Sequence, residues 1–298
     1  AKNFSRQYKL LQNNNNIYKN KKIRIGYYAS DFHEHPGMVN MAGIFANHNK
    51  KEFEIIGFYY GDINKDKTHY KIKKYFDKFF YVDQLDDIEI LNLSIENKID
   101  IAIYRAGLTN NARSSIFSNK VAPIQINFLA YPGTTGQEGV DYIISDKFVI
   151  PENQQKYYSE KIIYLTNCYY PRDNTRQISS TIFNRQEAKI PKESFVYCSF
   201  NNSYKITFDE FNIWLKILKK VPNSILLLLR SNDVMVKNLK VKLIENNIDI
   251  NRIIFFDKID FEDHLSRLSL ADLFLDSFNY NAHTSAVDAL WTGLPILT

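Results

Sequence analysis

Cysteine and glycine are scarce in this chain of 298 residues, which holds two Cys and ten Gly. Cys168 and Cys198 form no C-x-x-C motif, so the sequence indicates neither a zinc site nor a disulfide framework. No apolar run approaches the roughly 20 residues of a membrane helix, because the longest, residues 225–229, has only the length of a strand. These absences exclude a small disulfide-stapled fold and a helical membrane protein, and we expect a soluble protein of the reducing cytoplasm.

Negative charge is missing from residues 1–30, which contain seven Lys or Arg and no Asp or Glu. The whole chain has 38 Lys and Arg against 33 Asp and Glu, a formal charge of +5, so the remaining residues are almost balanced. Binding along a nucleic acid requires cations spread over a folded face. The same segment lacks the apolar centre of a secretory signal. We therefore expect neither nucleic acid nor a membrane as a partner.

Several signature motifs are also absent. The sequence has no G-x-G-x-x-G, no P-loop and no G-x-S-x-G, which removes the usual dinucleotide, NTPase and serine-hydrolase signatures. No Asp-x-Asp stands at a predicted strand end to hold Mg²⁺ or Mn²⁺. His33, Glu34 and His35 offer metal-binding side chains, but the two His are only two positions apart and no third ligand is evident. We expect no metal and no cofactor.

Strand and helix patterns alternate after the first 22 residues, which we interpret as a linker or the end of an upstream segment. At about 100–200 residues per domain, the length suggests two domains, which we place at residues 23–178 and 179–298 on either side of a polar stretch. Strands are predicted at residues 23–28, 54–60, 100–104, 124–128, 142–144, 161–165, 195–200, 225–229, 253–256 and 273–275. Helices are predicted at residues 86–97, 237–245, 262–270 and 284–292, and between a Thr207–Glu210 capping box and Pro222. The alternation predicts an α/β fold with parallel sheets, in which ligands bind beyond the carboxyl ends of the strands.

The segment 281–288 follows a predicted strand and opens a predicted helix. The first-turn N–H groups of such a helix attract a phosphate, to which His283, Thr284 and Ser285 add side-chain donors. Asp288 lies one turn later, where its carboxylate can accept hydrogen bonds from ribose hydroxyls. A Thr cap followed by a solvated Asp explains the same residues, and spacing alone favours this second interpretation.

Four further groups follow strands or share a helix face. Lys205, in the segment Asn201-Asn-Ser-Tyr-Lys205, can offset the charge of a leaving diphosphate, although a surface lysine is the commoner case. His264 and Arg267 lie one turn apart and can stack on a base and bind its edge, or form a solvated helix face. His35 can take or steer a proton near neutral pH. The turn at Pro132, Gly133 and Thr134 offers backbone N–H and hydroxyl groups that can hold an oxyanion or a sugar. Pro-Gly is also an ordinary turn sequence.

Read in order, these segments resemble the catalytic region of the O-GlcNAc transferase and SPINDLY family of glycosyltransferases. The matching stretches are IRIGYYASDFHEHP (23–36), GLTNNAR (107–113), APIQINFLAYPGTTG (122–136), DYIISD (141–146), YYSEKIIYL (157–165), FNNSYKI (200–206), ILKKVPNSILLLLR (217–230), NRIIF (251–255) and HLSRLSLADLFLDSFNYNAHTSAVDALWTGLPILT (264–298). The resemblance implies a GT-B arrangement of two Rossmann-like domains with a cleft between them, the first on the acceptor side and the second on the nucleotide-sugar side.

The resemblance also implies a role for each matching residue. By motif position, His283, Thr284 and Ser285 contact the donor diphosphate, Asp288 contacts its ribose, and Lys205 neutralises the leaving phosphate. Asn202 is a further donor contact, His264 and Arg267 bind the uracil, and Tyr204 with Pro132, Gly133 and Thr134 surrounds the transferred sugar. His35 matches a histidine for which the roles of general base and of substrate positioning are both considered. Phe261 departs from the family, since it stands where the animal enzymes have a lysine near the uridine.

The activity implied is that of an inverting, metal-independent glycosyltransferase that moves N-acetylglucosamine from UDP-GlcNAc to Ser or Thr hydroxyls of a protein. Alternatives are a protein O-fucosyltransferase using GDP-fucose or another sugar donor, and an inactive nucleotide-binding fragment. The family continues through another helix beyond the position of Thr298, and tetratricopeptide repeats precede its catalytic region. We therefore expect a fragment of a longer bacterial-type protein, with an incomplete second domain and repeats upstream.

Overall fold

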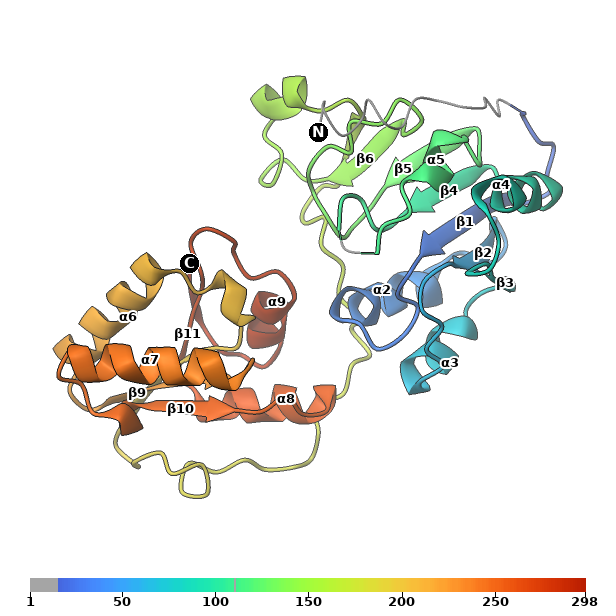
Figure 1. The fold of residues 1–298 in the computed structure, drawn as a ribbon. Helices are drawn as coiled ribbons and strands as arrows, with labels where there is room; N and C mark the ends of the chain where they lie inside the picture. The colour runs from blue at the N-terminus through green and yellow to red at the C-terminus, as the bar shows by residue number, and fades with distance from the viewer. Residues whose placement is uncertain (1–15, 110) are drawn as a thin grey trace. The chain divides into compact units, whose positions relative to one another are not determined.

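The computed structural model describes residues 16–109 and 111–298, which form two compact units, one ending at Asn174 and the other beginning at Thr175 (Figure 1). Residues 1–15 of the predicted linker lie outside the described residues, as does Asn110 of the matching stretch 107–113. In the part of the chain that is described, no helix is long and apolar enough to span a membrane.

The first unit contains a seven-stranded parallel sheet with the strand order β3-β2-β1-β4-β5-β6-β7. Its strands are β1 (Ile23–Ala29), β2 (Phe53–Tyr59), β3 (Lys78–Tyr81), β4 (Ile101–Tyr104), β5 (Ile124–Asn127), β6 (Tyr142–Ser145) and β7 (Lys161–Tyr164). Its helices are α2 (Pro36–Asn47), α3 (Lys67–Lys73), α4 (Asp87–Glu96) and α5 (Ser115–Ser118), with a 3₁₀ helix at Glu152–Tyr157.

The second unit contains a five-stranded parallel sheet with the order β10-β9-β8-β11-β12. Its strands are β8 (Phe195–Ser199), β9 (Ser224–Leu229), β10 (Ile253–Phe256), β11 (Leu273–Leu275) and β12 (Ile296–Leu297). Its helices are α6 (Phe208–Lys220), α7 (Asp233–Glu245), α8 (Phe261–Arg267) and α9 (Thr284–Trp291), with 3₁₀ helices at Ser203–Lys205, Ile250–Arg252 and Leu268–Leu270.

Helices cover both faces of each sheet because the strands are apolar on both sides. In β8, Val196 and Cys198 pack into one core and Tyr197 into the other, as expected when successive side chains point to opposite faces. The core that contains Tyr197 includes residues of α6 and α7, and the opposite core includes residues of α8 and α9 (Figure 1). In the first unit, α2 and α3 pack on one face of the sheet and α4 and α5 on the other (Figure 1).

Most predicted elements are confirmed, and the capping box that begins α6 is present. The Thr207 hydroxyl accepts from the Glu210 amide, while the Glu210 carboxylate accepts from the Thr207 amide at 2.8 Å. One predicted helix bound is wrong. Helix α7 begins at Asp233, four residues before the predicted start, because the Asn232 side chain caps it. The predicted helix 262–270 is α-helical only through Arg267, and its last turn is 3₁₀.

Candidate active site

Several of the predicted site residues follow the strands at which the strand order of each sheet reverses. In the first unit this switch point lies between β1 and β4, and in the second between β8 and β11. His35 follows β1, Lys205 follows β8, and the segment that begins α9 follows β11. Ligands of doubly wound sheets bind in the crevice outside such switch points.

In the second unit, Asp276 and Glu210 shape the loop that connects β11 to α9. The buried carboxylate of Asp276 accepts from the amides of Ser277 and Ala282, each at 2.7 Å, and from the Asn281 side chain at 3.2 Å. The buried Glu210 carboxylate accepts from the Phe278 amide. These charge-assisted bonds fix the backbone that leads into the helix.

Lys205 lies beside this loop. Its Nζ donates to the Asn281 carbonyl at 3.2 Å and lies 4.2 Å from the centre of the Tyr280 ring. Burial lowers the pKa of Lys205, and the Asp276 carboxylate partly opposes that effect. The Tyr280 ring is also 5.9 Å from the His283 ring, whose pKa is lowered by burial and then by the positive charge of Lys205. Lys205 and the start of α9 therefore form one electropositive corner.

Helix α9 begins at Thr284, with His283 at its N-cap position. The backbone carbonyl of His283 accepts from the Val287 amide at 3.0 Å, whereas its side chain makes no capping bond. Thr284 and Ser285 occupy the first turn. Because the amides of a first turn have no carbonyl partner within the helix, this end of α9 can bind an anion, next to the ammonium group of Lys205.

Asp288 is buried and paired with Arg176, which precedes the first strand of the same unit. The Arg176 Nη1 lies 2.9 Å from the Asp288 Oδ1, and both side chains are 5% exposed. The Arg176 guanidinium stacks on Phe261, 3.7 Å from the ring centre. Arg176 thus places a cation on the ring of Phe261.

His264 and Arg267 contact each other directly. The Arg267 Nη2 lies 2.7 Å from the His264 Nδ1, and the Arg267 Nη1 donates to the Asp257 carbonyl at 2.8 Å. Burial, followed by the charges of Arg267 and Arg176, lowers the pKa of His264 to about 4. A guanidinium can only donate, so the His264 Nδ1 accepts and its Nε2 carries the proton. Arg267 itself is buried, which makes it a support for His264 in this structure.

Asn202 and Tyr204 lie in the turn that ends at Lys205. Asn202 is exposed at the N-cap of the 3₁₀ helix Ser203–Lys205, and its carbonyl accepts from the Lys205 amide at 3.0 Å. Tyr204 is 70% exposed and its ring stacks on that of Tyr280, with 6.4 Å between the ring centres. The structure therefore brings these two residues together with Lys205.

The turn at Pro132, Gly133 and Thr134 follows β5 in the first unit and is held by hydrogen bonds of its own. The Pro132 carbonyl accepts from the Tyr158 hydroxyl at 2.9 Å. The Thr134 hydroxyl donates to Glu160, which is buried, at 2.6 Å. In this structure the Thr134 side chain therefore stabilises the turn.

Sequence reasoning did not single out Arg176, Tyr280 or Glu160. Glu160 stands within a matching stretch, and Tyr280 lies one residue before the segment 281–288, so their positions gave a weak signal. Arg176 lies in the polar stretch between the domains and is 112 residues from its partner Asp288. Only the tertiary fold reveals such a pair.

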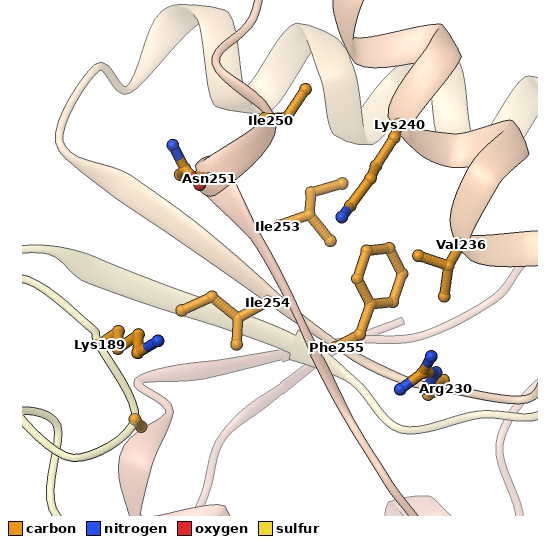
Figure 2. A pocket seen from close by; sticks show the side chains of 10 residues that line it. Lys189, Arg230, Val236, Lys240, Ile250, Asn251, Ile253, Ile254 and Phe255 are labelled. Carbon is orange, nitrogen blue, oxygen red and sulfur yellow. The ribbon is translucent and has the colours of Figure 1, made fainter. Parts of the chain in front are cut away.

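The described residues of the second unit also line a cavity of about 560 Å³ along β10, at the edge of the sheet. Figure 2 shows its cations, Lys189, Arg230 and Lys240, around the apolar side chains of β10. None of the site residues predicted from the sequence lines this cavity. Among the described residues, no three His, Cys, Asp or Glu side chains are grouped for a metal ion.

Two Rossmann-like units with polar side chains at their switch points define a doubly wound α/β protein. The profile described as glycosyl transferase family 41 matches residues 4–179 and 173–298. The chain belongs to this family.

Two plant relatives and one solved structure agree with this assignment. The chain is 34% identical over 285 residues, 93% of its length, to the probable UDP-N-acetylglucosamine–peptide N-acetylglucosaminyltransferase SEC of Arabidopsis thaliana. It is 27% identical over 294 residues, again 93% of its length, to the SPINDLY protein of that plant, which carries the same enzyme description. The chain spans only 29% and 31% of these relatives.

The solved structure is a mutant of the O-GlcNAc transferase of Thermobaculum terrenum. It superposes with a TM-score of 0.87 at 23% identity, over 99% of this chain and 56% of that one. The predicted family resemblance and the predicted fold class, Rossmann-like domains of the GT-B type, are both confirmed.

Proposed function

We propose that this chain is the catalytic region of an inverting, metal-independent glycosyltransferase that moves N-acetylglucosamine from UDP-GlcNAc to Ser or Thr hydroxyls of a protein. The names of the relatives support the donor and the peptide acceptor. The single observation that carries the proposal within this chain is the corner formed by Lys205, Tyr280 and the first turn of α9.

This corner suits a departing diphosphate. As the bond between the anomeric carbon and the diphosphate oxygen breaks, its electron pair leaves with the diphosphate, and negative charge grows on the phosphate oxygens. Lys205 and the amides of Thr284 and Ser285 supply positive charge there without reorganising, which is usually the largest protein contribution to such a step. The acceptor oxygen attacks the opposite face of the anomeric carbon, so its configuration inverts.

The nucleoside would extend toward Asp288 and His264. The Asp288 carboxylate can accept from ribose hydroxyls, and the His264 Nε2 can donate to a carbonyl oxygen of a pyrimidine base. Arg176 contacts Asp288 and lowers the pKa of His264, so one guanidinium influences both ends of the nucleoside.

Exchange of Lys205 tests the proposal. We expect Lys205→Met to lower kcat for UDP-GlcNAc about 10²–10³-fold, the loss typical of removing one preorganised donor, while Lys205→Arg retains a larger share of turnover. Lys216→Met is the matched control, because Lys216 is a surface lysine on helix α6. Full donor turnover by Lys205→Met would refute the proposed role.

Donor identity is tested by measuring hydrolysis of UDP-GlcNAc, UDP-glucose and GDP-fucose side by side, together with calorimetric titration of UDP. Preference for GDP-fucose would replace the proposed donor. A chain that binds no UDP and hydrolyses no donor would be an inactive fragment.

A further inference from the structure

A buried ion pair lies behind His35 at the switch point of the first sheet. Asp31 and His35 follow β1, and Arg105 directly follows β4, its neighbour in the sheet. The Arg105 amide donates to the Tyr28 carbonyl at 3.3 Å, which continues the β1–β4 pairing. The three side chains are therefore brought together by the two central strands.

The contacts of His35 determine which ring nitrogen carries the proton. Its Nδ1 lies 3.0 Å from the Asp31 Oδ2, 3.3 Å from the Gly37 amide and 3.4 Å from the Arg105 Nη2. A carboxylate only accepts, whereas an amide and a guanidinium only donate, so one nitrogen cannot satisfy all three. The carboxylate contact is the shortest, and it assigns the proton to Nδ1 and the lone pair to Nε2.

The ion pair is buried, and the imidazole extends from it toward solvent. Arg105 is 4% and Asp31 is 9% exposed, whereas the His35 side chain is 45% exposed. The Arg105 Nη1 donates to the same Asp31 Oδ2 that contacts His35. The Asp31 carboxylate thus contacts the buried Arg105 guanidinium and the more exposed His35 ring at the same time.

The ion pair of Asp31 and Arg105 contains buried polar atoms whose burial costs stability. Within the described part of the chain, the Asp31 Oδ1 and the Arg105 Nε are buried without a hydrogen-bond partner. Burying charged groups with unsatisfied atoms costs stability, and a buried ion pair is weak evidence for a stabilising role. A Cβ on Gly37 would lie 2.2 Å from the Arg105 Nη2, so a larger residue at this position would have to displace the guanidinium.

We propose that Asp31 and Arg105 are positioning residues for His35, an inference that rests on the proposed glycosyl transfer. Asp31 accepts the Nδ1 proton and fixes the ring so that Nε2 faces the acceptor. The acceptor oxygen forms its bond to the anomeric carbon, Nε2 takes the hydroxyl proton, and the diphosphate leaves with the electron pair of the broken bond. Asp31 then stabilises the imidazolium, and Arg105 holds Asp31 in place while offsetting its charge.

Asp31→Asn is the first test, measured as UDP release from UDP-GlcNAc in the presence of a library of serine-containing and threonine-containing peptides. The new amide donates to Nδ1 and moves the ring proton to Nε2, so we expect kcat to fall about 10²–10⁴-fold. We expect an unchanged KM for the donor and a shifted acid limb of the pH–rate profile. Arg105→Met should show a smaller loss of the same kind, which Arg105→Lys partly restores.

Lys120→Met is the matched control. Lys120 is buried in the same unit and its Nζ lies 2.7 Å from Asp141, in another ion pair. Its loss destabilises the unit but should leave kcat and the pH–rate profile of the folded protein unchanged. A purely structural role for Asp31 predicts that Asp31→Asn behaves like this control, and that outcome would overturn the inference.

A second measurement does not depend on turnover. Nitrogen NMR of histidine-labelled protein above pH 7.5 should show His35 with its proton on Nδ1 in the wild type and on Nε2 in Asp31→Asn. A wild-type proton on Nε2 would overturn the inference even if the enzyme is active. Absence of UDP binding and donor turnover in the wild type would instead refute the proposed function, with the NMR result still deciding the arrangement of the ring.

Discussion

Arg176 and Asp288 form a buried ion pair at 2.9 Å, although 112 residues separate them in the sequence. Arg176 comes directly after the boundary between the units, and Asp288 lies on α9. The pair therefore anchors the entry of the chain into the second unit to the helix whose first turn forms the proposed diphosphate site.

Removing Arg176 should leave a buried carboxylate without its cation. We expect Arg176→Met to reduce the free energy of unfolding by about 3–5 kcal/mol, as measured by urea denaturation, because breaking one half of a buried pair is strongly destabilising. The variant Arg176→Met/Asp288→Asn should regain much of that loss. If Asp288 binds the ribose, the double variant folds but binds UDP more weakly in calorimetric titration. Wild-type UDP affinity in the double variant would contradict the ribose assignment.

His264 should make the stability of the second unit depend on pH. Burial lowers its pKa to about 4, below the ordinary value of 6.5, so the unfolded state takes up a proton first as the pH falls. The contribution of neutral, buried His264 to the free energy of unfolding is complete above about pH 6.5. It is lost as the pH falls from 6.5 to 4, and the loss is at most about 3 kcal/mol.

Burial also lowers the pKa of His283, His69 and His48, and all three change the stability in the same direction. Comparison of the wild type with His264→Asn therefore isolates the contribution of His264. We expect urea denaturation at pH 7.5 and pH 5 to show a smaller pH-dependent loss in the variant. Equal losses in both proteins would mean that His264 titrates normally in the folded state.

The sequence predicts the strand-and-helix framework because its signals are local. The strand 225–229 and the Thr207–Glu210 capping box are visible in short windows, and the structure contains both. Helix α2 has Pro36 in its first turn but His35, an uncommon capping residue, at its N-cap, and β3 is a short strand at the edge of the sheet. These two elements were not predicted.

The site is predicted in part for the same reason. Lys205 and the residues 283–288 stand at strand ends that a sequence pattern can locate. The partners Arg176, Tyr280 and Arg105 reach the site through tertiary contacts across the sheet or between distant loops. Their positions follow from packing, which no short stretch of sequence contains.

Glu160 should stabilise the turn at Pro132, Gly133 and Thr134. Its carboxylate accepts from the Thr134 hydroxyl at 2.6 Å and from the Thr135 amide at 2.7 Å. Bonds to a buried charged acceptor are stronger than neutral ones, so we expect Glu160→Gln to cost about 2–3 kcal/mol in urea denaturation.

Glu152→Gln is the control for Glu160→Gln. Glu152 pairs with Lys147 at the surface, with both side chains mostly exposed, and its loss should leave stability unchanged. If Glu160→Gln lowered the free energy of unfolding no more than Glu152→Gln does, the turn would not depend on Glu160. Donor hydrolysis by Glu160→Gln then reports whether an ordered turn is needed for the reaction.

The two cysteines should react with a thiol reagent at very different rates. Cys168 is exposed, whereas Cys198 is buried in β8, where burial raises the pKa of its thiol. The thiolate is the reactive species, so Cys198 should be labelled only when the second unit opens. In a Cys168→Ser variant, the slow labelling of Cys198 therefore reports the opening of the proposed nucleotide-binding unit alone.

UDP should slow that labelling if it binds the second unit. A ligand at 100 times its Kd stabilises the native state by about 2.7 kcal/mol, which corresponds to labelling about 100-fold slower when opening is a rapid equilibrium. ADP at the same concentration tests base recognition, because it offers the same diphosphate to Lys205 and α9 but presents an adenine to His264. Equal protection by both nucleotides would assign binding to the diphosphate corner alone, and no protection by either would contradict nucleotide binding by this unit.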